Sequence, residues 1–543
     1  PDRAPADRER NGVLLSGAYK LSDDTSFVVD GYYLDAKDKP DLGSFFDRTT
    51  REPIEDIPVY VQDSDFLDTK VNSFTVRLKH SFSESLSMQN SMRYGTTDNG
   101  YVTTGIGGTT RDVTDPDAPG AATYSLSGHQ GWQEVDYFVN QLNLFWETPI
   151  AGLANQIAFG LEYSQEDVRN GTYSLNNTGA TNCILPGRRG GPAGAGHCVL
   201  DANGAEVANL NNLLGREITK NSFDSNFQVN TISAYAMDTV ELSDAWTGFF
   251  GLRYDQFDYE NTVRQRGGAG FDDYDYDDGF WNGHAGLVYK IAENGNVYAT
   301  YSTATNINGG ESDVGGSCGY GGLCGTPQQV KDSDPEQTEN LELGTKWSLS
   351  DGRLLLSAAV FRITKEDVME SVGNAYSTLG TLNTGKNRVE GFELSLVGNV
   401  TDKLSVQASA AFMESEILNA FNTTNEGLAL SNFADDSLYL QVRYQATPKF
   451  AFGAIYTYQS EMFGGQPDTA AGFDANINDY SIVVPSFDKY DMFLSYDISD
   501  KLSMRLNVNN VTDEEYWLAA YRSGTFMYLG DARSYRATLS WDI

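Results

Sequence analysis

Apolar and polar residues alternate along much of the chain, and a period of two predicts β-strands with one apolar and one polar face. The clearest case lies near the C-terminus, at residues 501–509. There the apolar set is Leu502, Met504, Leu506 and Val508, and the polar set is Ser503, Arg505, Asn507 and Asn509. The same split occurs at 74–79, 404–412 and 535–543.

The connections between these segments alternate between short and long. Short polar turns are expected at 22–25, 83–85, 293–295, 350–352, 401–403, 447–449 and 499–501. Long excursions are expected at 36–68, 96–131, 174–224, 306–334 and 461–484. A soluble β-sandwich has no reason to keep every second loop short, whereas an outer-membrane barrel has short periplasmic turns and long extracellular loops. The pattern therefore predicts an all-β fold, a transmembrane antiparallel β-barrel with its apolar face toward lipid and its polar face toward the lumen.

Counting strands between the connections gives about 19. Bacterial single-chain barrels have even strand numbers, and the first strand, near Asn11, is expected to run down to a periplasmic turn. Three further N-terminal strands would give 22. Residues 1–543 are accordingly interpreted as one outer-membrane barrel whose first strands are absent.

Composition agrees with this interpretation. The chain has 543 residues, with 31 Tyr, 28 Phe, 7 Trp and 54 Gly, as expected for a transmembrane barrel. No run of 18 apolar residues occurs, so no membrane-spanning helix is predicted. With 75 acidic and 38 basic side chains, the formal charge is −37, which argues against nucleic acid as a partner.

The four cysteines fall in two of the expected long loops. Their even number and local spacing predict two disulfides, Cys183–Cys198 and Cys318–Cys324, formed in an oxidising compartment. A zinc site is the alternative, but C-x-x-C spacing is absent and the only nearby histidine is His197.

An acidic, tyrosine-rich segment at 271–279 suggests calcium, because Asp273, Asp275 and Asp277 have D-x-D-x-D spacing. An EF-hand fails, since its sixth position is Asp278 rather than Gly and its twelfth is His284 rather than Glu. The favoured interpretation is a strand entrance, with these three aspartates facing inward and the tyrosines at 274 and 276 in the outer aromatic girdle. Adventitious binding of divalent cations to the acidic loops stays open.

No catalytic arrangement is found. The four histidines are scattered, and the chain has neither H-E-x-x-H nor G-x-S-x-G. We therefore expect no enzyme activity, no cofactor and no metal site.

Several segments, in order along the chain, resemble TonB-dependent ferric-siderophore receptors of the catecholate type. They lie at 38–43, 251–255, 297–302, 335–347, 387–393, 506–516 and 530–534. The resemblance implies a receptor in the outer membrane of a Gram-negative bacterium that takes up a ferric siderophore. It also implies coupling to TonB and its inner-membrane energising complex through an N-terminal plug, and contact with membrane lipid and lipopolysaccharide.

Three features depart from the family pattern. The plug and its TonB box are absent, the last residue is Ile543 where the family usually ends in Phe, and the negative charge is high for a receptor of anionic chelates. Other ligands (haem, cobalamin or a saccharide) therefore remain as alternatives, as do a passive porin and a surface-adhesion role for the loops.

A ferric chelate presents aromatic rings and polar atoms, so aromatic and hydrogen-bonding side chains in loops are candidates to bind it. The candidates are Phe45, Phe46, Tyr320, Tyr521, Arg522 and Phe526. The alternative for each is packing of loop against loop, or a place in the outer girdle.

Overall fold

The computed structural model describes residues 3–187, 191–265, 270–307, 334–371, 381–465, 469–521, 524 and 526–542. Its main feature is a single 19-stranded sheet in which each strand pairs antiparallel with the next wall strand along the chain. The wall strands are β1 (Asp7–Lys20), β2 (Thr25–Lys39), β5 (Phe66–Ser81), β6 (Leu86–Thr110), β7 (Ala122–Ile150), β8 (Leu153–Asn177), β11 (Arg216–Ser243), β12 (Trp246–Arg264), β13 (Phe271–Ala292), β14 (Gly295–Asn306), β15 (Glu336–Leu349), β16 (Leu354–Ser371), β17 (Thr381–Asn399), β18 (Leu404–Asn419), β19 (Asp436–Thr447), β20 (Phe450–Gln459), β25 (Phe487–Ser499), β26 (Leu502–Asn509) and β29 (Ser534–Trp541).

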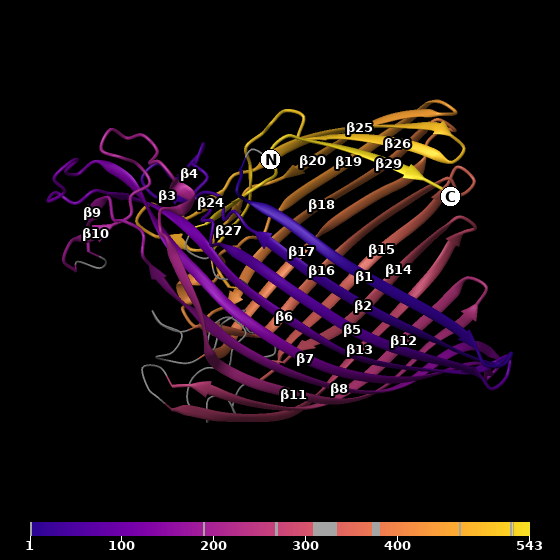
Figure 1. Cartoon of the computed structure of the whole chain (residues 1–543). Helices are drawn as coiled ribbons and strands as arrows, with labels where there is room; N and C mark the ends of the chain where they lie inside the picture. Colours follow the sequence, from indigo (N-terminus) through magenta and orange to yellow (C-terminus); the bar gives the residue numbers. More distant parts are fainter. Residues whose placement is uncertain are drawn as a thin grey trace.

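The remaining elements are short and lie in the connections. They are β3 (Phe46–Asp47), β4 (Glu52–Pro53), β9 (Cys183–Leu185), β10 (Gly194–Gly196), η2 (Leu210–Asn212), η3 (Thr423–Asn425), β21 (Met462–Phe463), β22 (Phe473–Asp474), β23 (Asp479–Tyr480), β24 (Val483–Val484), β27 (Trp517–Ala520) and β28 (Met527–Leu529). Labelled loop strands such as β3, β9 and β24 lie at one end of the curved wall, and short turns lie at the other (Figure 1). Among the described residues, no helix is long and apolar enough to cross a membrane.

The predicted short turns are confirmed, and so is the count of about 19 strands. β1 is joined to β2, and β25 to β26, by only a few residues. The long excursions are in part wrong. Most of 96–131 is strand, because β6 and β7 continue far past the expected loop start and pair up to Thr110 and Ala122.

The two edges of the sheet, β1 and β29, are exposed along their whole length. Within the described residues no ladder joins them. With 19 alternating strands the first and the last run in the same direction, so a direct β1–β29 pairing would be parallel. The fold is that of a barrel wall with an open seam.

The predicted face assignment near the C-terminus is confirmed. Val508 pairs with Met492, which is exposed on the outer surface, whereas Asn507 pairs with the buried Phe493. The guanidinium of Arg505 lies over the Phe493 ring, 4.9 Å from its centroid. The apolar set of β26 therefore faces outward and the polar set faces the lumen.

Two levels of aromatic side chains bracket the apolar outer face. Near the short turns, Trp246 stacks on Tyr289 with ring centroids 4.4 Å apart. Eight residues further along these strands, Tyr254 contacts Trp281 at 4.8 Å. Eight residues of strand span about 26 Å, which for a tilted strand suits the apolar band of a membrane barrel.

Above the second aromatic level, the apolar residues lie on the inner face and the polar residues on the outer face, the reverse of the arrangement below it. The alternation of the two kinds of residue along the strand continues unbroken. On β12, Phe250 and Leu252 are exposed outward, but further up the buried residues are Phe257 and Tyr259. The β12–β13 register has no break from Trp246 to Arg264, so the exchange is not a bulge. It has a physical cause, because above the bilayer the outer face meets water and the inner face can pack.

This exchange corrects the interpretation of the acidic segment. Asp275 and Asp277 pair with Glu260 and Asp258 on the exposed outer face, and Asp273 lies on the same face. Tyr276 turns inward and is buried. The aspartates do not line the lumen, and Tyr276 is not in the outer girdle, because this part of β13 stands above the membrane.

Candidate functional site

The mouth of the barrel brings together loops that are far apart in the sequence. The loop after β2 pairs with β28 in the last loop through an isolated bridge between Ser44 and Met527. The Ser44 N–H donates to the Met527 carbonyl at 2.9 Å, and the Phe46 N–H donates to the Gly524 carbonyl at 2.9 Å. Two of the regions that contain predicted binding residues therefore form one packed unit.

Gly43 is the residue that permits this contact. It has a φ of +79°, and a Cβ atom there would lie 2.1 Å from the Met527 carbonyl oxygen. Its own carbonyl accepts a 2.7 Å hydrogen bond from the buried Tyr60 hydroxyl. Because neither the backbone angle nor the space tolerates a side chain, the glycine is needed for this packing.

Three of the predicted binding aromatics are buried in this unit: Phe45 is 7% exposed, Phe46 is 5% and Phe526 is 3%. Phe45 packs with Tyr60 and Ile106, and Phe46 packs with Trp517 and Met527. Their rings are covered by other loops and by the upper parts of β6 and β7, so in this conformation they contribute packing rather than a surface for a ligand.

Tyr521 is half-buried and remains partly accessible beside them. Its ring lies 5.3 Å from that of Phe526, and the imidazole of His129 on β7 lies 4.4 Å from Phe526. Burial lowers the pKa of His129. The other two predicted binding residues, Tyr320 and Arg522, lie outside the described residues, as do Cys318 and Cys324 with their predicted disulfide.

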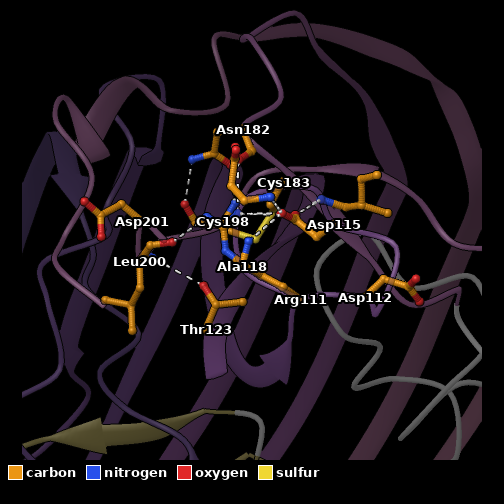
Figure 2. A network of polar contacts seen from close by, with 12 residues as sticks. Arg111, Asp112, Asp115, Ala118, Thr123, Asn182, Cys183, Cys198, Leu200 and Asp201 are labelled. Carbon is orange, nitrogen blue, oxygen red and sulfur yellow. Dashed lines mark hydrogen bonds and ion pairs between the residues drawn. A yellow bond between two sulfur atoms is a disulfide. The ribbon is translucent and has the colours of Figure 1, made fainter. Parts of the chain in front are cut away.

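The predicted Cys183–Cys198 disulfide is present. It lies beside a buried ion pair in which Arg111 Nη1 donates to Asp115 Oδ2 at 3.2 Å (Figure 2). The Ile184 N–H donates to the same carboxyl oxygen at 2.7 Å, and Arg111 Nη2 donates to the Leu200 carbonyl at 3.0 Å. This cluster, hereafter the disulfide hub, ties the β6–β7 tip to two parts of the β8–β11 connection.

Backbone donors keep the Asp115 carboxylate ionised. Besides Ile184, the Asp117 and Ala118 N–H groups donate to its Oδ1 at 3.0 and 3.2 Å. These bonds, with that from Ile184 the largest cause, lower the pKa of Asp115. A carboxylate that accepts several N–H bonds favours its charged form.

A second buried pair, Asp65–Arg216, joins the first long loop to the wall. Arg216 Nη1 lies 3.0 Å from Asp65 Oδ1, and the two side chains are 1% and 0% exposed. The Thr104 hydroxyl donates to the same carboxyl oxygen at 2.9 Å. Here burial dominates, raising the pKa of Asp65 and lowering that of Arg216.

The upper interior of the wall carries an aromatic cluster from four neighbouring strands, with one residue from β16. Its buried members are Val168, Phe227, Val229, Phe257, Tyr259, Tyr276 and Met369. The Tyr276 hydroxyl has no hydrogen-bond partner within the described residues. The cluster gives the upper lumen an apolar lining in which the Tyr276 hydroxyl is the polar group without a hydrogen-bond partner among the described residues.

Below it, at membrane depth, the lumen wall is polar. Arg253 Nη2 donates to Glu162 at 2.8 Å, and Arg253 Nε donates to Asp255 at 2.9 Å. The Ser233 hydroxyl accepts from the same guanidinium at 2.7 Å. This network is typical of a barrel that encloses water or polar groups rather than an apolar core.

Reasoning from the sequence did not identify the disulfide hub's ion pair, the Asp65–Arg216 pair or the Arg253 network. Arg253 and Asp255 did stand in a segment that resembles the receptor family, which was a usable signal. No group of three or more potential metal-binding side chains is found in the part of the chain that the structure describes.

Comparison with known proteins places this wall in a family. The family described as TonB dependent receptor-like, beta-barrel, matches residues 14–511. The probable TonB-dependent siderophore receptor PiuA of Acinetobacter baumannii is 25% identical over 548 residues, covering 95% of this chain and 68% of that protein. The catecholate siderophore receptor Fiu of Escherichia coli K12 is 26% identical over 502 residues, covering 88% of this chain and 60% of that protein.

The crystal structure of the Acinetobacter baumannii receptor PiuA agrees in fold. It superposes with a TM-score of 0.80 at 23% identity, over 98% of this chain and 74% of that one. The chain thus spans only part of the length of its relatives. The family is one of receptors and transporters and is not an enzyme class. From its sequence match and its barrel wall, the chain belongs to the TonB-dependent receptor-like β-barrel family.

Proposed function

We propose that this protein is the barrel of an outer-membrane receptor that takes up a ferric siderophore with energy from TonB. The observation that carries the proposal is the likeness, over most of the chain, to receptors named for siderophores, one of them for catecholates. The polar lumen wall and the loops packed over the mouth suit a ligand that is captured outside and passed inward. The activity is transport, with no catalytic step.

We also propose that the working barrel contains further strands between β29 and β1, together with a plug. Both edge strands expose their backbone groups, and such edges are rarely left open in a barrel. An odd number of added strands makes every pairing antiparallel, and three would give the even total of 22. The plug would occupy the lumen, which in a barrel of this size is otherwise an aqueous channel.

The proposal is tested by growth on defined iron sources. A strain that lacks the gene is expected to grow poorly on limiting ferric 2,3-dihydroxybenzoate and to recover when the gene is restored. Parallel cultures on haem iron, cobalamin or a limiting saccharide test the alternative ligands. A defect confined to one of those cultures would reassign the ligand, and passive conductance by the purified protein in planar bilayers would favour a porin.

A further inference from the structure

A carboxyl group faces the lipid side of the wall, at Asp238 on β11. Asp238 pairs with Phe250 of β12 on one side and with Ile157 of β8 on the other. Side chains directly opposite each other in a sheet share a face, and Phe250 is 56% exposed on the outer surface. Asp238 therefore points away from the lumen and lies among apolar neighbours.

The two aromatic levels place Asp238 near the middle of the apolar band. Its neighbour Phe250 is four residues from Trp246, in the lower level, and four residues from Tyr254, in the upper level. Four residues of strand span about 13 Å, so a lipid headgroup at either surface does not reach this depth. An ionised carboxylate is costly in hydrocarbon, so the neutral acid is the favoured form here.

The Asp238 side chain has an unsatisfied hydrogen-bonding atom. Its Oδ1 is shielded by the protein and has no hydrogen-bond partner among the described residues. The next outward residues on β11, Ala236 and Val240, have apolar side chains and offer no donor. A polar group at this depth finds no water, so a partner must come from outside the chain.

Two asparagines on the same outer face show how the chain satisfies polar groups elsewhere in the band. Asn140 on β7 is opposite the exposed Met92 of β6, and therefore faces outward. Asn90 on β6 donates from Nδ2 to Asn140 Oδ1 at 3.2 Å. These two side chains satisfy each other within one copy, whereas Asp238 does not have such a neighbour.

The outer surface beside Asp238 is recessed. A groove of about 980 Å³ begins at Val240 and Leu242 on β11 and extends across the following strands. Gly248 on β12 lines it, and a Cβ atom there would meet only Leu242, at 3.4 Å or more, and the Gly286 carbonyl oxygen, at 4.0 Å. The protein's own side chains leave this part of the outer face unfilled, so a partner can pack closely against it.

The carboxyl group indicates which partner fits. Lipid chains carry no hydrogen-bond donor at mid-membrane depth, but a second copy of this chain carries an identical acid at the same depth. A two-fold axis along the membrane normal brings the same residue of both copies together. Two neutral carboxylic acids then satisfy each other, because the O–H of each donates to the carbonyl oxygen of the other.

We propose that the outer face around Asp238 is the interface of a symmetric homodimer, in which the Asp238 side chains of two copies hydrogen bond within the membrane. The two-fold axis places the β8 side of one copy against the β12 side of the other. Phe159 of β8, which is 42% exposed, then faces the near end of the groove. The proposal requires that the outer face meets lipid and does not depend on which ligand is transported.

The test is the oligomeric state of the full chain in lipid bilayers, measured by single-molecule photobleaching at increasing dilution into lipid. The wild type is expected to form dimers. Asp238→Leu removes both hydrogen bonds and is expected to weaken the dimer about tenfold. Asp238→Asn keeps a donor and an acceptor, so two amides can pair in the same way, and it is expected to dimerise nearly as well as the wild type.

Two exposed phenylalanines supply a matched control. Phe159→Ala trims the proposed interface and is expected to weaken the dimer several-fold. Phe412→Ala trims a side chain that is 45% exposed on the outer face of β18, away from Asp238, and is expected to leave the dimer unchanged.

Three results would overturn the interface. The first is a wild type that stays monomeric at every dilution, with native mass spectrometry showing only lipid bound to the monomer. The second is Asp238→Leu dimerising as tightly as the wild type. The third is a dimer that Phe412→Ala weakens as much as Phe159→Ala, which would place the contact elsewhere on the barrel.

Discussion

Two buried arginine–aspartate pairs hold the mouth of the barrel, and they do so by different means. In the disulfide hub, the Asp115 carboxylate is surrounded by backbone N–H groups, and its pKa is lowered. In the Asp65–Arg216 pair, burial outweighs the hydrogen bonds, and the pKa of Asp65 is raised. The same two residue types thus form two different kinds of pair. The ionised carboxylate is favoured at Asp115, whereas at Asp65 burial makes the ionised carboxylate energetically costly.

The largest effect is expected from Asp65→Ala. It leaves Arg216 buried without its partner, and breaking a buried pair in this way costs about 3–5 kcal/mol. The loss should appear in the free energy of local opening of residues 57–65 and 210–216, measured by amide hydrogen exchange.

The double variant Asp65→Leu with Arg216→Met serves as the control. It removes both charges, and replacement of a buried pair by apolar groups is often neutral. If Asp65→Ala is no less stable than the double variant, the Arg216 guanidinium is not held in a buried position once its partner is removed.

Removal of the disulfide comes next. The double variant Cys183→Ser with Cys198→Ser opens a loop with a sequence separation of 15, which costs about 3 kcal/mol in the chain-entropy model. Hydrogen exchange should quicken in the hub and stay unchanged around Asp65. An equal increase in hydrogen exchange around both ion pairs would mean that the loops open as one unit. It would contradict the view that the two pairs hold the mouth independently.

A smaller effect is expected from Asp115→Asn. The amide keeps one acceptor oxygen but places an NH₂ group against backbone donors, so part of the N–H set loses its acceptor. Exchange should quicken either at the Ile184 amide, which donates to Oδ2, or at the Asp117 and Ala118 amides, which donate to Oδ1, depending on which oxygen the NH₂ group replaces. The disulfide should stay formed. Wild-type exchange rates at all three amides would show that the backbone bonds do not hold the loop.

The smallest effect, and the sharpest test, is the response to acid. The lowered pKa of Asp115 means that its contribution is complete above the ordinary value of 3.8 and is lost as the pH falls below it. The raised pKa of Asp65 has the opposite sign, with its contribution present in acid and lost as the pH rises through the raised value. Exchange measured from pH 5 to pH 2.5, corrected for intrinsic rates, should quicken only in the hub. Parallel behaviour of the two pairs would contradict the difference.

The wall could be predicted from the sequence because its pattern is local. Alternation at 501–509 fixed which residues share a face, and short polar turns fixed where strands reverse. The exchange of faces above the membrane could not be predicted in this way. Tyr276 and Asp277 alternate equally well in either environment, and only the height of the strand above the bilayer decides which of them faces inward.

The mouth was less predictable because its contacts are distant in sequence. Asp65 and Arg216 are 151 residues apart, and nothing near either residue marks the other. Phe45 and Phe526 were identified as aromatic loop residues, but residue type does not distinguish a ring that binds a ligand from one that packs under another loop. The Cys183–Cys198 pair was predictable because its partners are close in the chain.

The exchange of faces on β12 and β13 also fixes how deeply the protein sits in a bilayer. Asp258, Glu260, Asp275 and Asp277 form facing acidic pairs on the outer surface just above the upper aromatic level. A thicker membrane cannot rise over them without placing carboxylates in hydrocarbon, at a cost of kilocalories for each charge. The bilayer must instead thin or adjust at the other end of the strands, so thickness mismatch is relieved on the periplasmic side. These acidic residues thus fix the position of the outer membrane–water boundary on the strands. The height of the mouth above the membrane is set by the sequence rather than by the lipid.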